Sequence, residues 1–273
     1  TTFDAIIGLP ANIFFGTGIP TIIMVLRKNK RDSDVLIIDA SKGFEKDGKN
    51  NKLRACDIKR IVDAYKERPE KIEKFARRVS RAEIVQNDYN LNIPRYVDSS
   101  EKAESWDIYA SMFGGIPEAE LQDLSAYWTA FPHLKAALFS PDNEAYCHLN
   151  VQNLKNAVLS HPDVVAFKTA FQNAFGDFDA YLKSALIDGM TQLNAAGEEE
   201  RLSREIFARL AGIPLVDRYA AYQLLDDDWK KIAIDLEIIQ TEGFAATKQV
   251  DPNMVLKKDA EVQDGWGGSC AAL

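Results

Sequence analysis

FDAIIGLPANIFFGTGIP, residues 3–20, and TIIMVLRK, residues 21–28, open the chain and indicate its fold class. Two short apolar runs flank a loop that is rich in glycine and aromatic residues. Such runs are typical of strands that lie inside a sheet. The chain has no initiating methionine, and its first residues already follow a strand pattern. We therefore expect a piece of a larger α/β protein.

A third apolar run, residues 35–38, follows after a short polar link. Continuous apolar runs of this length predict strands that are covered by helices on both faces. The link is too short for a crossover helix, so the runs at 22–26 and 35–38 are expected to be antiparallel neighbours. The prediction is a mainly parallel sheet that finishes in an antiparallel hairpin.

Smaller elements are predicted around this sheet. A polar loop at 42–52 precedes a helix whose apolar positions run from Leu53 to Tyr65. We expect a strand at 75–79, a short helix at 81–86 and an extended segment at 87–97.

From about Ser99 the character changes to a polar linker, which ends at Pro117. After it the pattern is helical for roughly 120 residues, and five or six helices are predicted, with Pro117 as a first helical residue. Aromatic residues from Phe167 to Phe178 recur at helical spacing and are assigned to helix core rather than to a cofactor site. The fold class is therefore α/β followed by a mainly α-helical domain. The predicted parts are a sheet domain at 1–98, a linker at 99–116, a helical domain at 117–243 and an irregular tail at 244–273. In that tail we expect a hairpin at 254–262 and a vector-derived end at 269–273.

Composition is that of an ordinary globular protein, with 46% hydrophobic and 27% charged residues. No apolar run is long enough to cross a bilayer, and no secretory signal is present. The cysteines, Cys56, Cys147 and Cys270, show no metal-ligand or disulfide spacing, so a reduced, cytoplasmic protein is expected.

Charge is distributed unevenly along the chain. Residues 1–100 hold 19 Lys/Arg and 14 Asp/Glu, whereas residues 101–273 hold 14 Lys/Arg and 27 Asp/Glu. A basic front and an acidic back favour different partners for the two halves, although ordinary fluctuation of charge is an equal alternative.

No complete catalytic or metal-binding constellation is visible in the sequence. The histidines, His133, His148 and His161, have no partner at ligand or nucleophile spacing and are assigned to surface or capping positions. Nucleophile elbows, phosphate-binding loops and zinc-binding helices do not occur. The run at 226–228 lacks the spacing of a calcium loop and is assigned to the solvated side of a helix. We predict no catalytic residue and no metal ligand in this chain.

Several longer motifs occur in order along the chain and together resemble one family. They are the stretch at 6–20, VLIIDAS at 35–41, NNKLR at 50–54, NDYNLNIPRY at 87–96, FARL at 207–210, YQLLDDDW at 222–229 and QTEGFAATK at 240–248. This set is similar to the modification subunit of type I restriction–modification systems, with a likeness that runs to about Trp266. Such subunits are adenine-specific DNA methyltransferases.

The resemblance implies a Rossmann-like methyltransferase sheet, of which this chain would hold the C-terminal part, and S-adenosylmethionine as the cofactor of the full-length subunit. The family's Gly-containing cofactor loop and its Asn-Pro-Pro motif do not occur, and the chain contains no Pro-Pro pair. The fragment is therefore expected to be inactive alone and to bind no cofactor.

The family also implies partners. They are a specificity subunit, a second modification subunit, a restriction subunit and double-stranded DNA, with no membrane. The resemblance implies that residues 117–243 serve in this assembly, because helices near the C-terminus of such modification subunits pack on the specificity subunit. Direct contact of this domain with nucleic acid is not expected, because it is acidic and has no DNA-binding signature.

The opening loop carries the candidate substrate site. Chemistry on a base requires its removal from the stack, and aromatic or apolar side chains grip the flipped base. In related enzymes an aromatic residue at the corresponding place packs on the flipped adenine. The candidates here are Phe14, Phe15, Gly16, Thr17 and Gly18, with glycines that let the backbone approach closely. The alternative places both phenylalanines in a core between sheet and helix.

The basic cluster of Arg27, Lys28, Lys30 and Arg31 is the candidate for contact with DNA phosphates. A solvated hairpin tip is the equal alternative. For the whole chain, the alternative to a methyltransferase fragment is a non-catalytic scaffold or interaction protein built on a degenerate methyltransferase fold.

Overall fold

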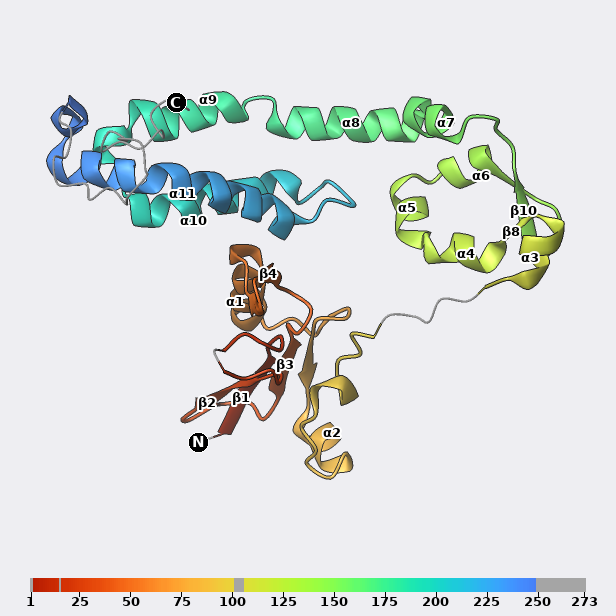
Figure 1. Ribbon diagram of the computed structural model, residues 1–273, viewed down its shortest axis with the longest axis horizontal. Helices are drawn as coiled ribbons and strands as arrows, with labels where there is room; N and C mark the ends of the chain where they lie inside the picture. Colours follow the sequence, from red (N-terminus) through yellow and green to blue (C-terminus); the bar gives the residue numbers. More distant parts are fainter. Residues whose placement is uncertain (1, 15, 101–105, 249–273) are drawn as a thin grey trace. The chain divides into compact units, whose positions relative to one another are not determined.

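The computed structural model describes residues 2–14, 16–100 and 106–248. The chain divides into two compact units, Thr1–Glu104 and Ser105–Leu273, which Figure 1 shows in red to orange and in yellow to blue. The first unit is built around a sheet, and the second is mainly helical.

A mixed five-stranded sheet forms the first unit. Its strands are β1 (Thr2–Gly8), β2 (Ile22–Arg27), β3 (Val35–Asp39), β6 (Lys71–Ile72) and β7 (Ala76–Val79). They lie in the order β2-β1-β3-β7-β6. Strands β1 and β3 pair in parallel, and the other three pairs are antiparallel. The predicted strands are confirmed, whereas the prediction of a mainly parallel sheet is wrong for the part of the chain that the structure describes.

The predicted pairing of the second and third apolar runs is also wrong, because β1 lies between β2 and β3. Ile6 of β1 has Met24 of β2 as its register partner on one side and Ile37 of β3 on the other. The link at 28–34 passes the start of β1, where Lys30 donates hydrogen bonds to the carbonyl oxygens of Phe3 and Asp34. The link at 28–34 is too short to contain a crossover helix, but it is long enough to pass β1 and join β2 to β3, because neighbouring strands lie only about 4.8 Å apart.

Helices cover both faces of β1 and β3, as predicted. Successive strand residues point to opposite faces, so the buried residues divide into two cores. The first core contains Ala5, Ile7, Leu36, Ile38 and, from α1 (Ala55–Glu67), Ile61 and Ala64. The second contains Ile6, Val35, Ile37, Val79, Tyr96, Val97 and, from α2 (Arg81–Gln86), Ile84.

Strand β2 differs from the buried strand that its apolar sequence predicts. It lies at the edge of the sheet, and Ile22, Ile23, Met24 and Leu26 are all exposed. Val25, which is half-buried, packs on the first core. An apolar strand with both faces open is unusual at a sheet edge.

A hairpin of β4 (Glu45–Asp47) and β5 (Asn50–Lys52) stands where the sequence predicted only a polar loop. Gly48, with φ of 60°, supplies the left-handed turn that such a tight connection requires. The predicted helices at 53–65 and 81–86 correspond to α1 and α2, and the extended segment at 87–97 contains the short 3₁₀ turn η1 (Ile93–Arg95). The hairpin escaped prediction because its strands are short and polar.

The second unit contains nine α-helices among its described residues; eight of them lie within 117–243, where five or six were predicted, and α3 lies in the predicted linker. They are α3 (Ile108–Phe113), α4 (Glu118–Asp123), α5 (Ser125–Ala130), α6 (Leu134–Leu138), α7 (Leu154–Ser160), α8 (Pro162–Phe175), α9 (Phe178–Leu182), α10 (Ala195–Leu210) and α11 (Arg218–Glu242). Short 3₁₀ and π segments, η2 (Lys183–Asp188), η3 (Met190–Gln192) and η4 (Phe244–Lys248), complete it.

A small sheet in this unit was not predicted. Strands β8 (Ile116–Pro117), β9 (Phe139–Pro141) and β10 (Tyr146–Leu149) pair antiparallel in the order β8-β10-β9. Pro117 therefore ends a strand and is the N-cap of α4 with an extended conformation. It lies one position before the first helical residue, whereas the prediction made it that first residue. Proline suits both places, because its fixed φ also fits extended backbone.

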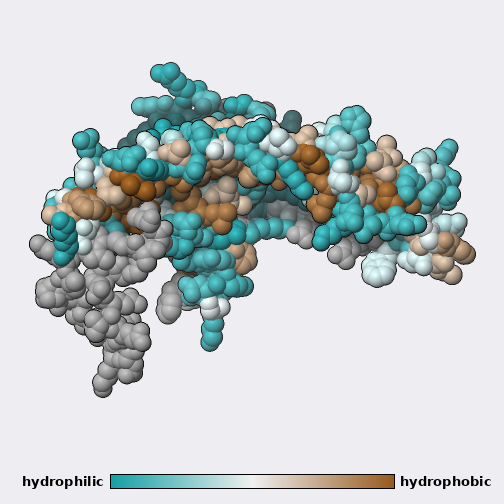
Figure 2. Space-filling view, turned by 90° about the horizontal axis from the view of Figure 1, so that it is seen from above, coloured by the Kyte–Doolittle hydropathy of each residue, from teal (hydrophilic) through white to brown (hydrophobic). Residues whose placement is uncertain are grey.

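Two separate cores lie in the second unit. Phe131, Leu134, Leu138 and Val164 form one, and Leu193, Leu202, Trp229 and Leu236 belong to the other. The space-filling view shows apolar patches between hydrophilic side chains (Figure 2). Within the described ranges, every helix is too short or too polar to cross a membrane. The predicted hairpin at 254–262 and the end at 269–273 lie outside the described residues.

Candidate functional site

The loop between β1 and β2 is closed at its base by a hydrogen bond from the backbone N–H of Leu9 to the carbonyl oxygen of Thr21, 2.8 Å. Asn12 and Gly16 adopt positive φ values, 57° and 79°. A Cβ added at Gly16 would meet no atom within 4 Å, so the backbone here faces open space. The loop is thus anchored at its base and open at its glycine, which leaves its backbone accessible to a ligand.

Phe14 stands at the surface of this loop, with 52% of its area exposed. Its carbonyl oxygen accepts a hydrogen bond from the N–H of Thr17, 3.3 Å, which forms a tight turn. Phe14 is therefore not part of a core among the residues that the structure describes, and its contact with a base stays a prediction. Phe15 lies outside the described residues, so its predicted role stays a prediction. Gly18 and the half-buried Thr17 complete the predicted set in the same turn region.

The segment at 87–97 packs against the carboxyl end of β1, directly below the loop. A Cβ at Gly8 would lie 2.7 Å from the Cδ1 atom of Ile93, so only glycine fits there without movement. Tyr96 donates a hydrogen bond to the carbonyl oxygen of Asn90, 2.5 Å, and fixes this segment internally. Two motifs of the resemblance, at 6–20 and at 87–96, therefore meet at Gly8.

Asn51 of β5 joins a third motif to the loop, and sequence reasoning missed this role. Its side-chain amide donates a hydrogen bond to the carbonyl oxygen of Ala11, 2.7 Å, and its backbone N–H donates to that of Asn12, 2.9 Å. The side chain is buried, and its Oδ1 atom has no hydrogen-bond partner among the described residues. The available signal was the place of Asn51 inside the NNKLR motif.

Asp39 ends β3 next to this loop. Its carboxylate accepts hydrogen bonds from the backbone N–H of Ser41, 3.0 Å, and from the hydroxyl of Ser99, 2.5 Å. It lines a polar cavity of about 250 Å³ together with Arg54 and Lys74. The carboxyl ends of the parallel strands β1 and β3 thus carry an aromatic loop, a buried amide and a carboxylate side by side.

The predicted phosphate site is in part a structural ion-pair cluster. Asp4 of β1 is fully buried, and its carboxylate accepts hydrogen bonds from Tyr65, 2.8 Å, and Arg68, 3.1 Å. Arg27 lies 3.1 Å and Lys30 lies 3.5 Å from the same carboxylate. Only 2% of the Lys30 side chain is exposed, so it does not present its charge to a ligand.

These contacts set the charge state of Asp4. Burial raises the pKa of its carboxyl group, but the hydrogen bond from Tyr65 and the positive charges of Arg68, Arg27 and Lys30 outweigh burial and lower the pKa. Arg27, whose pKa is raised by its hydrogen bond with Tyr65 and by Asp4, is half-exposed. The cluster therefore keeps a buried carboxylate ionised between β1, β2 and α1.

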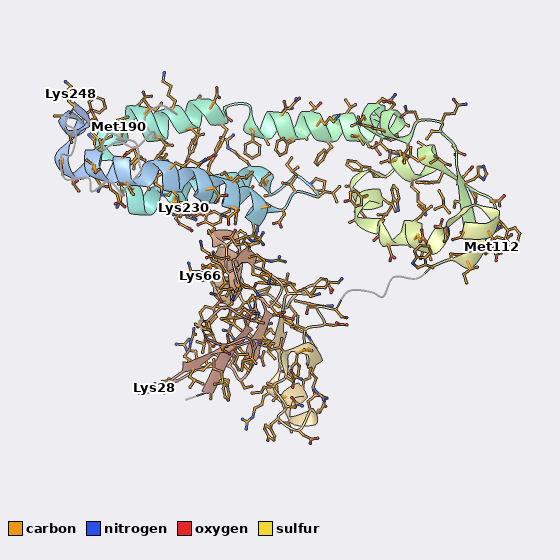
Figure 3. All side chains as sticks on the ribbon, in the orientation of Figure 1. Lys28, Lys66, Met112, Met190, Lys230 and Lys248 are labelled. Carbon is orange, nitrogen blue, oxygen red and sulfur yellow. The ribbon has the colours of Figure 1, made fainter. Side chains whose placement is uncertain are left out.

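Lys28 and Arg31 are exposed, and Lys28 lies beyond the end of β2 in Figure 3. The register pairs Arg27 with Thr2 and Ile22 with Gly8. The basic cluster and the aromatic loop thus occupy opposite ends of β1, roughly 20 Å apart at about 3.3 Å per strand residue. The structure does not bring the two predicted sites together, and phosphate contact by the exposed pair stays a prediction.

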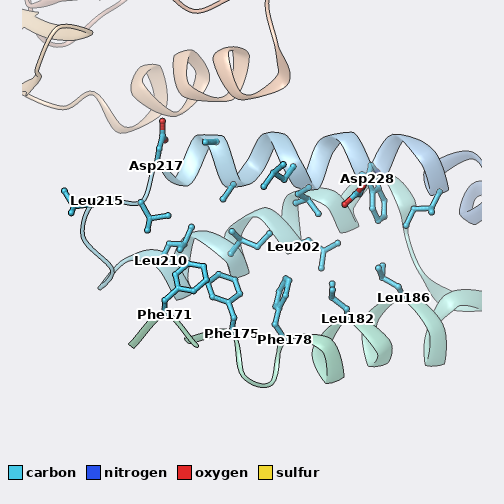
Figure 4. Close-up of a pocket in the computed structure, with 18 residues that line it drawn as sticks. Phe171, Phe175, Phe178, Leu182, Leu186, Leu202, Leu210, Leu215, Asp217 and Asp228 are labelled. Carbon is cyan, nitrogen blue, oxygen red and sulfur yellow. The ribbon is translucent and has the colours of Figure 1, made fainter. Parts of the chain in front are cut away.

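An apolar groove of about 790 Å³ lies within the second unit (Figure 4). Phe171, Phe175 and Phe178 line one side, and Leu210 of α10 and Leu224 of α11 line others. The aromatic stripe was predicted to be helix core, but Phe171 is exposed and its helix ends at Phe175 before α9 begins. Phe167 packs on the core around Phe131 as predicted, whereas Phe171, Phe175 and Phe178 form the wall of an open groove.

Charged groups elsewhere in this unit are accounted for by local partners. His161 caps α8 and His133 contacts Asp163, as expected for capping and surface histidines. Within the predicted solvated run at 226–228, Asp226 is instead buried and pairs with Lys230, because it faces the neighbouring helix. No group of three potential metal ligands occurs among the described residues.

Comparison with known proteins gives a consistent result for the first unit. Residues 1–105 match the model of the N-6 DNA Methylase family. Over 106 residues the chain is 40% identical to the type I restriction enzyme MpnII methylase subunit of Mycoplasma pneumoniae, which covers 38% of this chain and 19% of that protein. The MjaVII methylase subunit of Methanocaldococcus jannaschii is 43% identical over 111 residues, with the same shares.

A solved structure, the type I restriction-modification system methyltransferase subunit from Streptococcus thermophilus, is 54% identical over 36% of this chain and 21% of that chain, with a TM-score of 0.35. The chain spans about a fifth of the length of these relatives. The resemblance to type I modification subunits is confirmed. The family model ends at residue 105, so the motifs quoted beyond it stay predictions.

Proposed function

We propose that residues 1–105, which match the N-6 DNA Methylase family, serve as the target-base side of an adenine-specific DNA methyltransferase, the modification subunit of a type I restriction–modification complex. The observation that carries this proposal is the exposed Phe14 on an anchored glycine loop. This loop lies at the carboxyl ends of β1 and β3, the edge at which α/β sheets bind their ligands.

The loop has the properties that a flipped base requires. An exposed phenyl ring offers a face on which adenine can stack, and such stacking contributes about 1–3 kcal/mol per base. Gly16 leaves space for close approach of a sugar or base edge. A Cβ at Gly8 would lie 2.7 Å from Cδ1 of Ile93, so the segment at 87–97 packs closely on the end of β1 that carries the loop.

The exposed side chains of the edge strand β2 support the proposal that the sheet continues beyond this strand in the complete subunit. Ile22, Met24 and Leu26 lie on one face and Ile23 on the other, and all are exposed. Apolar side chains on both faces suit an interior strand of a Rossmann-like sheet rather than an edge. We propose that β2 pairs with a further strand in the complete subunit and that this chain supplies the C-terminal part of that sheet.

S-adenosylmethionine is the proposed methyl donor of the complete subunit. The contribution proposed for residues 1–105 is to hold and orient the target base.

The second unit is proposed to serve in assembly with the specificity subunit, the second modification subunit and the restriction subunit. The open apolar groove supports this proposal, since contiguous exposed apolar surface marks interaction sites. Between residues 105 and 248 the sequence holds 11 Lys/Arg and 21 Asp/Glu, a balance that disfavours DNA and leaves protein partners as the better match.

The groove offers a matched test of assembly. Leu224 and Ile234 lie on α11 and are 69% and 67% exposed, but only Leu224 lines the groove. We expect Leu224→Glu to lower retention of the specificity subunit in a pull-down by the complete modification subunit, while Ile234→Glu leaves it unchanged. Equal retention by both variants would contradict the assigned surface.

Methylation itself is tested with the complete subunit assembled with its specificity subunit. Mass spectrometry of the digested DNA should detect N6-methyladenine. Phe14→Ala and, separately, Phe15→Ala should lower the rate at subsaturating DNA, while Phe3→Ala, at the other end of β1, should not. Full activity of both loop variants would contradict the base-binding role. Absence of methylation in the unaltered complex would favour a non-catalytic scaffold.

A further inference from the structure

We infer that the β4–β5 hairpin is a DNA-contacting element beside the aromatic loop, in which Lys46 and Lys49 bind phosphates and Asn51 links the hairpin to the loop. This inference rests on the proposed function, because it needs DNA at the carboxyl edge of the sheet. It adds a site that the basic cluster at 27–31 does not provide, since that cluster lies at the opposite end of β1.

The register of the hairpin decides which side chains face the loop. Lys46 of β4 is directly opposite Asn51 of β5, and directly opposed residues project from the same face. Asn51 faces the loop, because its amide bonds to the carbonyl oxygen of Ala11 at 2.7 Å. Lys46 therefore shares the face that is turned toward the loop.

The two faces of the hairpin differ in charge pairing. On the far face, Lys52 lies opposite Glu45 and its ammonium group is 3.8 Å from the Glu45 carboxylate. On the loop-facing side, the ammonium group of Lys46 lies 5.5 Å from the ring centroid of Phe44. Lys49, in the turn beside Gly48, is exposed and forms no ion pair with the residues that the structure describes. Two cations are thus available for phosphates.

Asn51 supplies an independent indication of a ligand. The residue is 6% exposed, yet its Oδ1 atom has no hydrogen-bond partner in the described chain. Thr21, which closes the base of the same loop, also carries a buried hydroxyl oxygen without a partner. A buried polar atom left unpaired costs about 1–3 kcal/mol, and in native structures such atoms mark functional groups, strained sites or places where water or an ion binds.

The chemistry of the two lysines fits the DNA backbone. Ammonium groups of lysine bind phosphates as point charges. Lys46 and Lys49 therefore match the phosphates that flank a displaced nucleotide, while the buried Asn51 holds the hairpin on the loop through its hydrogen bond to Ala11.

Binding of a short fluorescein-labelled duplex to the 273-residue chain, measured by anisotropy over a range of salt concentrations, tests this inference. Each lost phosphate contact makes the slope of log K against log salt shallower by about 0.9. The double variant Lys46→Gln/Lys49→Gln should therefore reduce the slope by about 1.8. The charge-matched control Lys155→Gln/Lys168→Gln changes two exposed lysines of the second unit and should leave the slope unchanged.

The hairpin role is overturned if the unaltered chain shows no salt-dependent binding or if the two double variants have equal slopes. Far-UV circular dichroism identical to that of the unaltered chain shows that the exposed substitutions leave the fold intact. Adenine methylation by the complete complex is a separate readout. If the complete complex methylates adenine but Lys46→Gln/Lys49→Gln leaves the salt slope unchanged, only the hairpin role is contradicted. If the double variant changes the slope but the complex does not methylate adenine, only the proposed function is contradicted.

Discussion

The side-chain amide of Asn51 donates a hydrogen bond to the carbonyl oxygen of Ala11 across 2.7 Å, joining two segments that are forty residues apart in the sequence. This contact ties a lysine-bearing hairpin to the loop that presents Phe14. Neither the hairpin nor the loop belongs to the buried sheet. Their relative position therefore depends on a small number of polar contacts.

Replacing Asn51 with alanine should weaken this junction. Loss of one buried hydrogen bond lowers the free energy of unfolding by about 1 kcal/mol. Asn50→Ala, at an exposed neighbouring position, is the control and should change it by less than about 0.5 kcal/mol. Urea unfolding followed by far-UV circular dichroism measures the change. All four tryptophans lie beyond residue 104, so tryptophan fluorescence reports on the second unit and should not shift.

Gly8 should resist replacement because of its contact with Ile93. In Gly8→Ala the added Cβ would stand 2.7 Å from Cδ1 of Ile93. Because that atom is the far end of a flexible side chain, we expect a loss near the low end of the range of about 1–3 kcal/mol that overpacking costs. Ile93→Val, which removes that methyl group, should recover part of the loss in the double variant. Thermal unfolding of the two single variants and the double variant measures this coupling. Strictly additive effects would contradict the contact.

Asp4 should make the free energy of unfolding of the first unit depend on pH in the acid range. Its folded-state pKa is lowered, so it lies below the unfolded value of about 3.9. The stabilising contribution is complete above about pH 4 and is lost as the pH falls through the folded-state value. Asp4→Asn should therefore lower the free energy of unfolding near neutral pH by about 3 kcal/mol and make its decline below about pH 4 shallower.

Asp32, an exposed carboxylate that also contacts Lys30, serves as the control for Asp4→Asn. Asp32 contacts Lys30 at 3.1 Å but is largely exposed, and exposed pairs contribute about 0–1 kcal/mol. Asp32→Asn should therefore lower the free energy of unfolding by no more than about 1 kcal/mol. Urea titrations at several pH values measure both variants, and similar losses in the two would show that the Asp4 cluster has no special role.

The open edge of β2 should cause this chain to self-associate. Its unpaired backbone groups and exposed apolar side chains favour addition of another strand. Ile22→Lys/Met24→Lys places charges on that edge and should shift sedimentation velocity profiles toward monomer. The control Leu159→Lys/Ile187→Lys alters two exposed apolar positions of the second unit. A monomeric unaltered chain at high concentration would contradict this expectation.

The strands β1, β2, β3 and β7 of the first unit followed directly from local sequence, but β4, β5 and β6 and the strand order did not. The apolar runs at 5–9, 22–26 and 35–38 predict strands because β-branched residues suit buried sheets. Which strand lies between the other two is decided by long-range contacts. Here Lys30 crosses the start of β1 and pairs with Asp4, an interaction that sequence spacing does not reveal.

The candidate site was predictable only in part for the same reason. The motif at 6–20 identified the loop, and Phe14 is exposed on it as a base-binding residue should be. The burial of Lys30 and the clamp made by Asn51 depend on segments that meet only in the folded chain. The hairpin at 45–52 escaped notice because six polar residues form its strands, and strand propensity is weak without apolar alternation.

The most direct test of the base-binding loop is the rate of adenine methylation by the complete subunit carrying Phe14→Ala. Loss of one aromatic stacked on a base costs about 1–3 kcal/mol, so kcat/KM for DNA should fall by about 5- to 150-fold. Phe3→Ala removes the same side chain at the far end of β1 and should retain the rate of the unaltered enzyme. Equal kcat/KM values for Phe14→Ala and the unaltered subunit would contradict the assignment of this loop to the target base.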